Sequence, residues 1–198
     1  MRSVIGRIEA NSPAGIPGRL GVTSALSGEG VSTTCTGLTA VLAREVDRQV
    51  CQVDLNWPWD DSFDDQATGI ADVVDGRLDL TDVIRWSTVD RSAFVSSGRS
   101  IDRGRHALAR SPALSVVVDD LAARFDHLVI DLPAVVDSDT LALARMCDAL
   151  LLVVRQGVTT ESQVRAALHE LRGSVVIGAV LNGARSSVPG VVQRLIDA

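Results

Sequence analysis

Ala25-Leu26-Ser27-Gly28-Glu29-Gly30-Val31-Ser32-Thr33-Thr34 is the stretch of sequence that decides the fold. It matches the phosphate-loop pattern G-x-x-x-x-G-K-[ST] at Gly30 and Ser32, and nearly so at Ala25. An apolar strand over residues 20–24 precedes the loop, and a helical pattern follows it to about residue 46. Glycines let the backbone curl so that successive N–H groups point inward, while the helix adds its positive end. We therefore expect phosphate to be bound by Gly28, Glu29, Gly30, Val31, Ser32 and Thr33.

The pattern's lysine, which reaches the outer phosphates, is replaced by Val31. The chain contains no lysine, so all 19 basic residues are arginines, but a drift from lysine to arginine would not place a valine here. Losing a charge-assisted contact of about 1.5–3 kcal/mol weakens binding roughly ten- to hundredfold. Losing one hydrogen-bond donor to the charge that develops in a transition state lowers the rate about 10²- to 10³-fold. We expect ATP or ADP with Mg²⁺ to bind weakly, and turnover to be inefficient.

Apolar runs alternate with helical patterns through the rest of the chain, as is typical of a parallel sheet covered on both faces. The expected strands are residues 20–24, 49–53, 93–97, 127–131, 149–154 and 175–181. Further helices are expected at residues 70–74, 80–84, 113–124, 141–146, 160–171 and 190–197. Residues 1–18 read as an irregular lead-in, and residues 98–110 as an arginine-rich turn. The sequence predicts one α/β domain over residues 1–198, with a doubly wound, mostly parallel sheet flanked by helices.

The composition limits which partners the chain can have and in which cellular compartment it is expected. The net charge of −6 weighs against nucleic acid as the main partner. Three cysteines, Cys35, Cys51 and Cys147, lie in apolar periodic segments and are expected to be reduced core residues. No run approaches the roughly 18 apolar residues of a membrane helix, and the N-terminus lacks a signal-peptide core. We expect a cytoplasmic protein without a direct membrane span.

Two carboxylates lie at the ends of predicted strands: Asp54 directly follows the strand at residues 49–53, and Asp131 is the last residue of the strand at residues 127–131. Strand ends of a parallel sheet converge on one rim, where ligands bind. One carboxylate could orient a water molecule, and the other could help Ser32 to hold Mg²⁺. The sequence thus predicts that Ser32, Asp54 and Asp131 hold Mg²⁺, and that both aspartates are catalytic if the chain is active.

With these segments in order, the chain resembles the capsular-polysaccharide ATPases related to bacterial tyrosine autokinases, within the MinD/ParA-like class of P-loop NTPases. The resemblance covers about residues 19–182 and rests on VTSA at 22–25 with GEG at 28–30, Val53-Asp54, GIADVVDG at 69–76, RFDHLVIDLP at 124–133, CDALLLVV at 147–154 and GAVLN at 178–182. It implies the P-loop NTPase fold and places Asn182 near the nucleotide base. It also implies a protein partner, either a membrane polysaccharide co-polymerase or an active paralogue, and a possible homo-oligomer.

The positions that depart from the family pattern are those expected to bind the nucleotide or take part in catalysis. Besides Val31, the second carboxylate of an Asp-x-Asp pattern is Asn56, and the paired proline after Asp131 is Ala134. The family's kinases carry a tyrosine-rich C-terminal tail, whereas these 198 residues contain no tyrosine. We therefore expect a degenerate regulatory or scaffolding subunit, associated with a membrane through its partner. The alternatives are an active ATPase or kinase that takes its cation from an arginine or a neighbouring subunit, and a MinD/ParA-like positioning factor.

Two further segments allow more than one interpretation. Residues 56–65, which include Trp57 and Trp59 among several aspartates, form either a packed acidic loop or a loop that docks a protein partner. Arg99, Arg103, Arg105 and Arg110, with His106, form either a solvated face, a substitute phosphate contact or a partner contact. The histidines, His106, His127 and His169, are too scattered to suggest a metal site.

Overall fold

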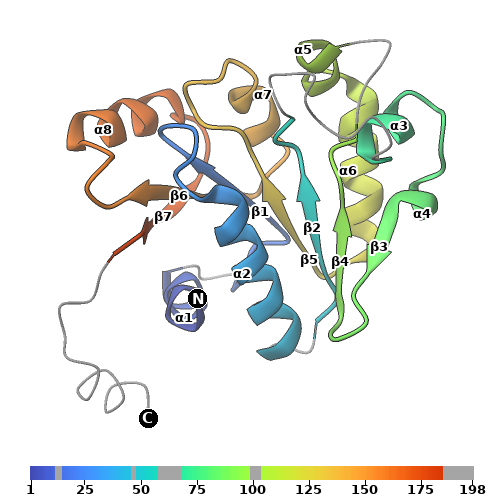
Figure 1. The fold of residues 1–198 in the computed structure, drawn as a ribbon, viewed down its shortest axis with the longest axis horizontal. Coiled ribbons are helices and arrows are strands. Elements are labelled where there is room, and N and C mark those ends of the chain that lie inside the picture. Colours follow the sequence, from blue (N-terminus) through green and yellow to red (C-terminus); the bar gives the residue numbers. More distant parts are fainter. Residues whose placement is uncertain (12–14, 46–47, 58–67, 99–103, 185–198) are drawn as a thin grey trace.

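The computed structural model describes residues 1–11, 15–45, 48–57, 68–98 and 104–184 of the 198-residue chain. Its strands form a seven-stranded sheet in the order β3-β4-β2-β5-β1-β6-β7 (Figure 1). The strands are β1 Arg19–Ser24, β2 Val50–Asp54, β3 Ile84–Trp86, β4 Ser92–Val95, β5 His127–Asp131, β6 Ala149–Arg155 and β7 Val176–Asn182. Neighbouring strands run parallel except for β3 and β4. The predicted mostly parallel sheet is therefore confirmed.

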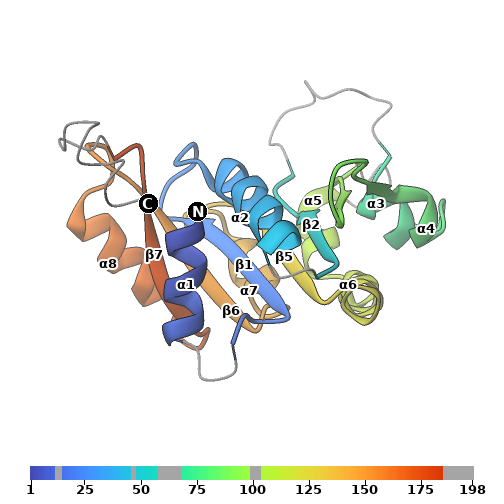
Figure 2. The ribbon, with the colours of Figure 1, turned by 90° about the horizontal axis from the view of Figure 1, so that it is seen from below.

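Helices cover both faces of this sheet. They are α1 Arg2–Asn11, α2 Val31–Glu45, α3 Ile70–Val74, α4 Leu80–Val83, α5 Gly104–Ala109, α6 Pro112–Arg124, α7 Thr140–Ala144 and α8 Glu161–Glu170. Figure 2 shows α1 and α2 on one face of the sheet. Apolar residues of α3, α6, α7 and α8 belong to a separate core cluster on the other face. Strand β5 supplies both clusters, because Leu128 and Ile130 point to one face and Val129 to the other.

The N-terminal part of the lead-in is helical, so the expectation of an irregular segment over residues 1–18 is wrong for residues 2–11. Helix α1 lies against β7 and α2 and buries Ile5 and Ile8, whose spacing of three puts them on one helix face. This short apolar stripe is flanked by turn residues, which hid the helix in the sequence pattern.

Two other elements differ from expectation. Residues 104–109 of the arginine-rich turn form α5, and the helix expected at 80–84 ends at Val83, where the chain turns into strand β3. Strand β3 is antiparallel to β4, a pairing that a short connection permits. The helix expected at residues 190–197 lies outside the described residues. No helix of the described part of the chain is long and apolar enough to cross a membrane.

Candidate functional site

The loop between β1 and α2 has the backbone of a phosphate-binding nest. Gly28 and Gly30 have φ angles of 79° and 96°, a left-handed conformation that glycine adopts without strain. Gly30 also has no room for a side chain, because a Cβ atom there would collide with the Asn182 amide. Helix α2 begins at Val31 and therefore presents its first N–H groups to the same space.

Side chains from the end of β6, the turn after it and the end of β7 hold this loop from outside. The Glu29 carboxylate is 1% exposed and accepts a hydrogen bond from the Leu26 N–H at 3.0 Å and another from the Thr159 hydroxyl. Asn182 Nδ2 donates to the Glu29 carbonyl at 2.8 Å, and Arg155 Nη1 donates to the Gly28 carbonyl at 3.3 Å. Glu29 and Asn182 thus fix the loop, and a contact of Asn182 with the nucleotide base stays a prediction.

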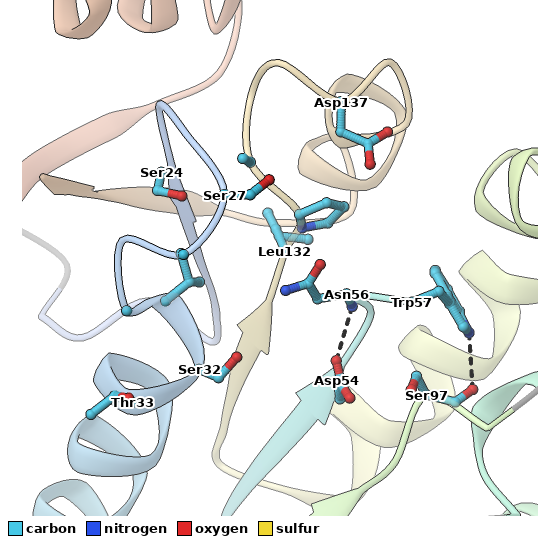
Figure 3. Close-up of a pocket in the computed structure, with 15 residues that line it drawn as sticks. Ser24, Ser27, Ser32, Thr33, Asp54, Asn56, Trp57, Ser97, Leu132 and Asp137 are labelled. Atoms are coloured by element: carbon cyan, nitrogen blue, oxygen red, sulfur yellow. Dashed lines mark hydrogen bonds between the residues drawn. The ribbon is translucent and has the colours of Figure 1, made fainter. Parts of the chain in front are cut away.

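A cleft of about 490 Å³ opens above the loop, at the carboxyl ends of β2 and β5 (Figure 3). It is lined by Ser24, Ser27, Gly28, Gly30, Val31, Ser32, Thr33, Asp54, Asn56, Trp57, Ser97, Leu132, Pro133, Ala134 and Asp137. The structure therefore brings the predicted loop and the strand-end residues of β2 together at one rim, as the convergence of parallel strands requires.

Asp54 and Asp131 are register partners on the adjacent strands β2 and β5. Burial raises the pKa of Asp54, although hydrogen bonds from Asn56 and Ser97 oppose the rise. Asp131 is 2% exposed, and burial raises its pKa to about 7 despite a hydrogen bond from Ser32. The charge of Asp54 adds to that rise. Two neighbouring carboxylates with raised pKa values form a site that a cation would stabilise.

The residues present fit Mg²⁺ better than they fit a triphosphate. Asp131 Oδ1 is buried and has no hydrogen-bond partner among the described residues, and the Ser32 hydroxyl lies against the same carboxylate. Such oxygen donors suit Mg²⁺, which commonly takes one or two carboxylates and completes its shell with water and phosphate. No cluster of three metal-binding side chains occurs in the described ranges. Val31, at the lysine position, is 7% exposed and packs in the α1–α2 core cluster. Its apolar side chain offers no charge to a phosphate.

Trp57 belongs to the core, which favours the packed interpretation over the docking interpretation for this residue. Its side chain is 5% exposed, and its indole N–H donates to the Ser97 carbonyl at 3.0 Å (Figure 3). An indole ring combines a large apolar surface with one donor, and the end of β4 supplies the acceptor. Residues 58–65, including Trp59, lie outside the described residues.

The basic residues of α5 and its flank are engaged with buried aspartates. Arg105 pairs with Asp137 at 2.9 Å and with Asp139 at 3.4 Å, and Arg110 pairs with Asp139 at 2.5 Å. His106 Nδ1 lies 2.7 Å from Asp139. Burial tends to raise the pKa of Asp139, but its bonds with His106 and Arg110 hold it below the usual value. These contacts anchor α5 to the loop after β5 and disfavour Arg105 or Arg110 as a substitute phosphate contact; Arg99 and Arg103 lie outside the described residues.

The cysteines and the remaining histidines of the described ranges lie outside the cleft. Cys35, Cys51 and Cys147 are free thiols, and burial raises the pKa of Cys51 to about 12. His127 Nδ1 lies 3.1 Å from the Pro17 carbonyl, and His169 lies near the end of α8. No histidine in the described ranges therefore joins a metal cluster.

Sequence reasoning missed the residues that hold the site from its edges: Thr159, Arg155, Asp137 and Ser97. Arg155 and Asn182 are paired at the ends of the adjacent strands β6 and β7. A search of all polar residues at strand ends would have included Arg155. The contact of Thr159 with Glu29 spans 130 residues of sequence and left no local signal.

No family model matches the chain, but its sequence is similar to those of bacterial tyrosine-protein kinases. It is 29% identical over 177 residues to the tyrosine-protein kinase CpsD of Streptococcus agalactiae, with 85% of this chain and 75% of that protein covered. It is 26% identical over 172 residues to the tyrosine-protein kinase YwqD of Bacillus subtilis, covering 84% and 72%. It is also 28% identical over 171 residues to the succinoglycan biosynthesis transport protein ExoP of Rhizobium meliloti, but covers 22% of that protein.

Solved structures show the same fold. The kinase domain of the Escherichia coli tyrosine kinase ETK superposes with a TM-score of 0.76 at 22% identity, covering 87% of this chain and 70% of that one. The septum site-determining protein MinD of Pyrococcus horikoshii, complexed with Mg-ADP, superposes with a TM-score of 0.65 at 21% identity, covering 91% and 77%. The chain is therefore related to the bacterial tyrosine-protein kinases and has the P-loop NTPase fold that MinD shares.

Proposed function

We propose that this chain binds Mg-ADP or Mg-ATP weakly, hydrolyses ATP slowly or not at all, and acts as a regulatory or scaffolding subunit in exopolysaccharide assembly. One observation carries the proposal: the uncharged Val31 occupies the position of the loop lysine, while the surrounding site is kept. The kept parts are the nest at Gly28 and Gly30 and the adjacent carboxylates Asp54 and Asp131.

Residual binding follows from groups that do not depend on a lysine. Backbone N–H groups of the loop and of the first turn of α2 would hold phosphate oxygens. Ser32, with Asp131 and Asp54 beside it, would hold Mg²⁺, which neutralises part of the phosphate charge when bound. Ser27 and the Pro133 to Ala134 segment line the remainder of the cleft.

Slow turnover is expected because the cleft lacks the loop cation and the second carboxylate. Phosphoryl transfer depends on cations placed against the charge of the transferred group, and Val31 offers none. Asn56 lines the cleft where the resembling family has a second carboxylate, and an amide is too weak a base to accept a proton at neutral pH. We therefore expect the chain to bind the nucleotide in its ground state but to stabilise the transition state of phosphoryl transfer poorly.

The partner is proposed from the relatives' names. ExoP is named a biosynthesis transport protein for succinoglycan, and CpsD is named a tyrosine-protein kinase. A chain of this kind with impaired chemistry would act by occupying a binding surface, either on a membrane polysaccharide co-polymerase or on an active paralogue. Such a subunit would be cytoplasmic and reach the membrane through that partner.

Isothermal titration of the whole chain with Mg-ADP and Mg-ATP, paired with a phosphate-release assay, tests the proposal. We expect measurable binding in the micromolar range or weaker and a turnover number well below 1 s⁻¹, the low end for ordinary enzymes. The matched control is Asp131→Asn, which should weaken Mg-dependent binding. Turnover at about 1 s⁻¹ or above would contradict the regulatory role, and absence of any binding would contradict the nucleotide site.

The second candidate, a working ATPase or kinase with an arginine in place of the lysine, draws on the contact of Arg155 with the loop. Rapid hydrolysis that vanishes in Arg155→Ala would favour it over the regulatory role. The third, a MinD-like positioning factor, draws on the likeness of fold.

A further inference from the structure

Arg155 lies on the outer side of the phosphate loop. It is the last residue of β6, the strand that pairs with β1, and its guanidinium donates to the Gly28 carbonyl at 3.3 Å. Thr159, in the turn that follows, donates to the Glu29 carboxylate, and Asn182 at the end of β7 donates to the Glu29 carbonyl. Donors from the ends of two strands therefore hold two consecutive loop carbonyls.

Arg155 forms no ion pair with a carboxylate in the described part of the chain. Several arginines there are paired with acidic side chains: Arg19, Arg44, Arg48, Arg77, Arg105, Arg110 and Arg165. The guanidinium of Arg155 instead bonds the carbonyl of Gly28, a residue that lines the cleft. A positive charge is thus fixed on the loop that lacks its lysine.

The geometry of the peptide group links that charge to the cleft. The Gly28 carbonyl and the Glu29 N–H belong to one peptide unit, and the Glu29 carbonyl and the Gly30 N–H belong to the next. In a trans peptide the N–H points opposite to the carbonyl, so a donor that fixes the carbonyl on one side also fixes the N–H on the other. The donor also polarises the unit, which makes the N–H a stronger donor to an anion. Arg155 does this with a full charge, and Asn182 does it with a neutral amide.

We propose that Arg155 is the positioning cation of this phosphate loop. It acts through the Gly28 carbonyl and supplies, from outside the nest, part of the positive potential that Val31 does not supply from inside. The ligand is the phosphate chain of a nucleotide, so the inference rests on the nucleotide binding proposed above. A charge on the outer side would strengthen ground-state binding without touching a transferred phosphoryl group, in keeping with the weak binding and slow turnover proposed above.

The test is a titration of Mg-ADP into the wild type, Arg155→Gln and Arg155→Lys. Glutamine keeps a donor for the Gly28 carbonyl and removes the charge, while lysine keeps the charge. Because Arg155 is exposed and partly screened, we expect Arg155→Gln to raise Kd about three- to tenfold. Arg155→Lys should stay within about twofold, and the difference should shrink at 1 M salt. The matched control is Arg165→Gln on α8, which removes an equal charge and should leave Kd unchanged.

A second arm places Val31→Lys beside each Arg155 variant. If both cations serve the same phosphates, Arg155→Gln should cost less affinity when Lys is present at position 31, a coupling that a merely structural role would not produce. Equal Kd values for wild type and Arg155→Gln would overturn this inference and leave the proposed nucleotide site standing. A Kd for Arg155→Lys as weak as for Arg155→Gln would overturn the charge argument. Absence of Mg-ADP binding by the wild type would overturn both proposals.

Discussion

Val31 sits where chemistry and packing meet, because it lines the cleft and also belongs to the α1–α2 core cluster. A lysine there could lay its apolar stem along the same contacts and extend its ammonium group into the cleft. We expect Val31→Lys to tighten Mg-ATP binding about tenfold or more. Isothermal titration measures this, with Val31→Met as an uncharged control of similar length. Unchanged affinity in Val31→Lys would mean that something other than the missing charge limits binding.

Asp131 makes stability depend on pH, because burial raises its pKa from 3.8 to about 7. Between these values the native state keeps a proton that the unfolded chain has released, so the free energy of unfolding falls as pH rises through this window. Asp131→Asn removes the effect. We expect the variant to exceed the wild type in unfolding free energy by about 1–4 kcal/mol at pH 8, with the gain shrinking toward pH 4.

Urea unfolding at pH 5 and pH 8 measures this difference, and Asp126→Asn supplies a control of opposite sign. The backbone N–H of Gln49 and the Arg48 guanidinium hold the pKa of Asp126 below its usual value. Its stabilisation is therefore present above the unfolded pKa of 3.8 and lost as pH falls below that value. Because pH 5 and pH 8 both lie above this window, Asp126→Asn should be less stable than wild type by a similar amount at both. An Asp131→Asn gain that does not change with pH would refute the raised pKa.

At the scale of elements, the sequence predicted what depends on local pattern. Asp54 and Asp131 could be placed at one rim because apolar runs marked their strands and parallel strand ends converge. Trp57 could not be assigned, because its burial depends on a carbonyl at Ser97, 40 residues away. The hold of Thr159 and Arg155 on the loop could not be predicted either, since it depends on how the turn after β6 meets the loop after β1.

Helix α1 adds to the core although its sequence pattern is weak. Ile8 is 5% exposed and lies in the cluster that includes Val31. We expect Ile8→Ala to lower the free energy of unfolding by about 2–4 kcal/mol, because a buried aliphatic group is replaced by a partial cavity. Urea unfolding measures it, with the exposed Glu9→Ala as the control. A loss below about 0.5 kcal/mol would show that α1 does not pack on the sheet in solution.

Trp57 joins the end of β2 to the end of β4, so it is expected to act on stability before it acts on any partner. Trp57→Phe keeps an aromatic ring and removes the indole donor, leaving the Ser97 carbonyl without that bond, and should cost about 1–3 kcal/mol. Trp57→Ala should cost about 3–5 kcal/mol. Chemical denaturation measures both. A Trp57→Ala variant with wild-type stability but altered capture of host proteins would restore the docking interpretation.

At the scale of the whole molecule, the strand order places β1 between β5 and β6, so the loop after β1 touches both neighbours. The loop after β1 is held by Arg155 and Thr159 from the β6 side, and Ser32 in the first turn of α2 lies against Asp131 of β5. A ligand in the cleft would therefore contact segments at the carboxyl ends of β1, β2 and β5. Because unfolding of the sheet would destroy the site, ligand binding should stabilise the entire domain by linkage.

The size of that stabilisation reports how far the site has lost affinity. Binding adds RT ln(1 + [L]/Kd) to the free energy of unfolding, so a tenfold difference in Kd changes it by about 1.4 kcal/mol when ligand is in excess. For a chain of this length, this corresponds to a shift in Tm of roughly 3–6 °C. We expect Mg-ADP to raise the Tm of Val31→Lys by at least that much more than it raises the Tm of the wild type. Calorimetry with Mg²⁺ alone as the control measures this, and equal shifts in the two proteins would place the weakness of the site elsewhere than at position 31.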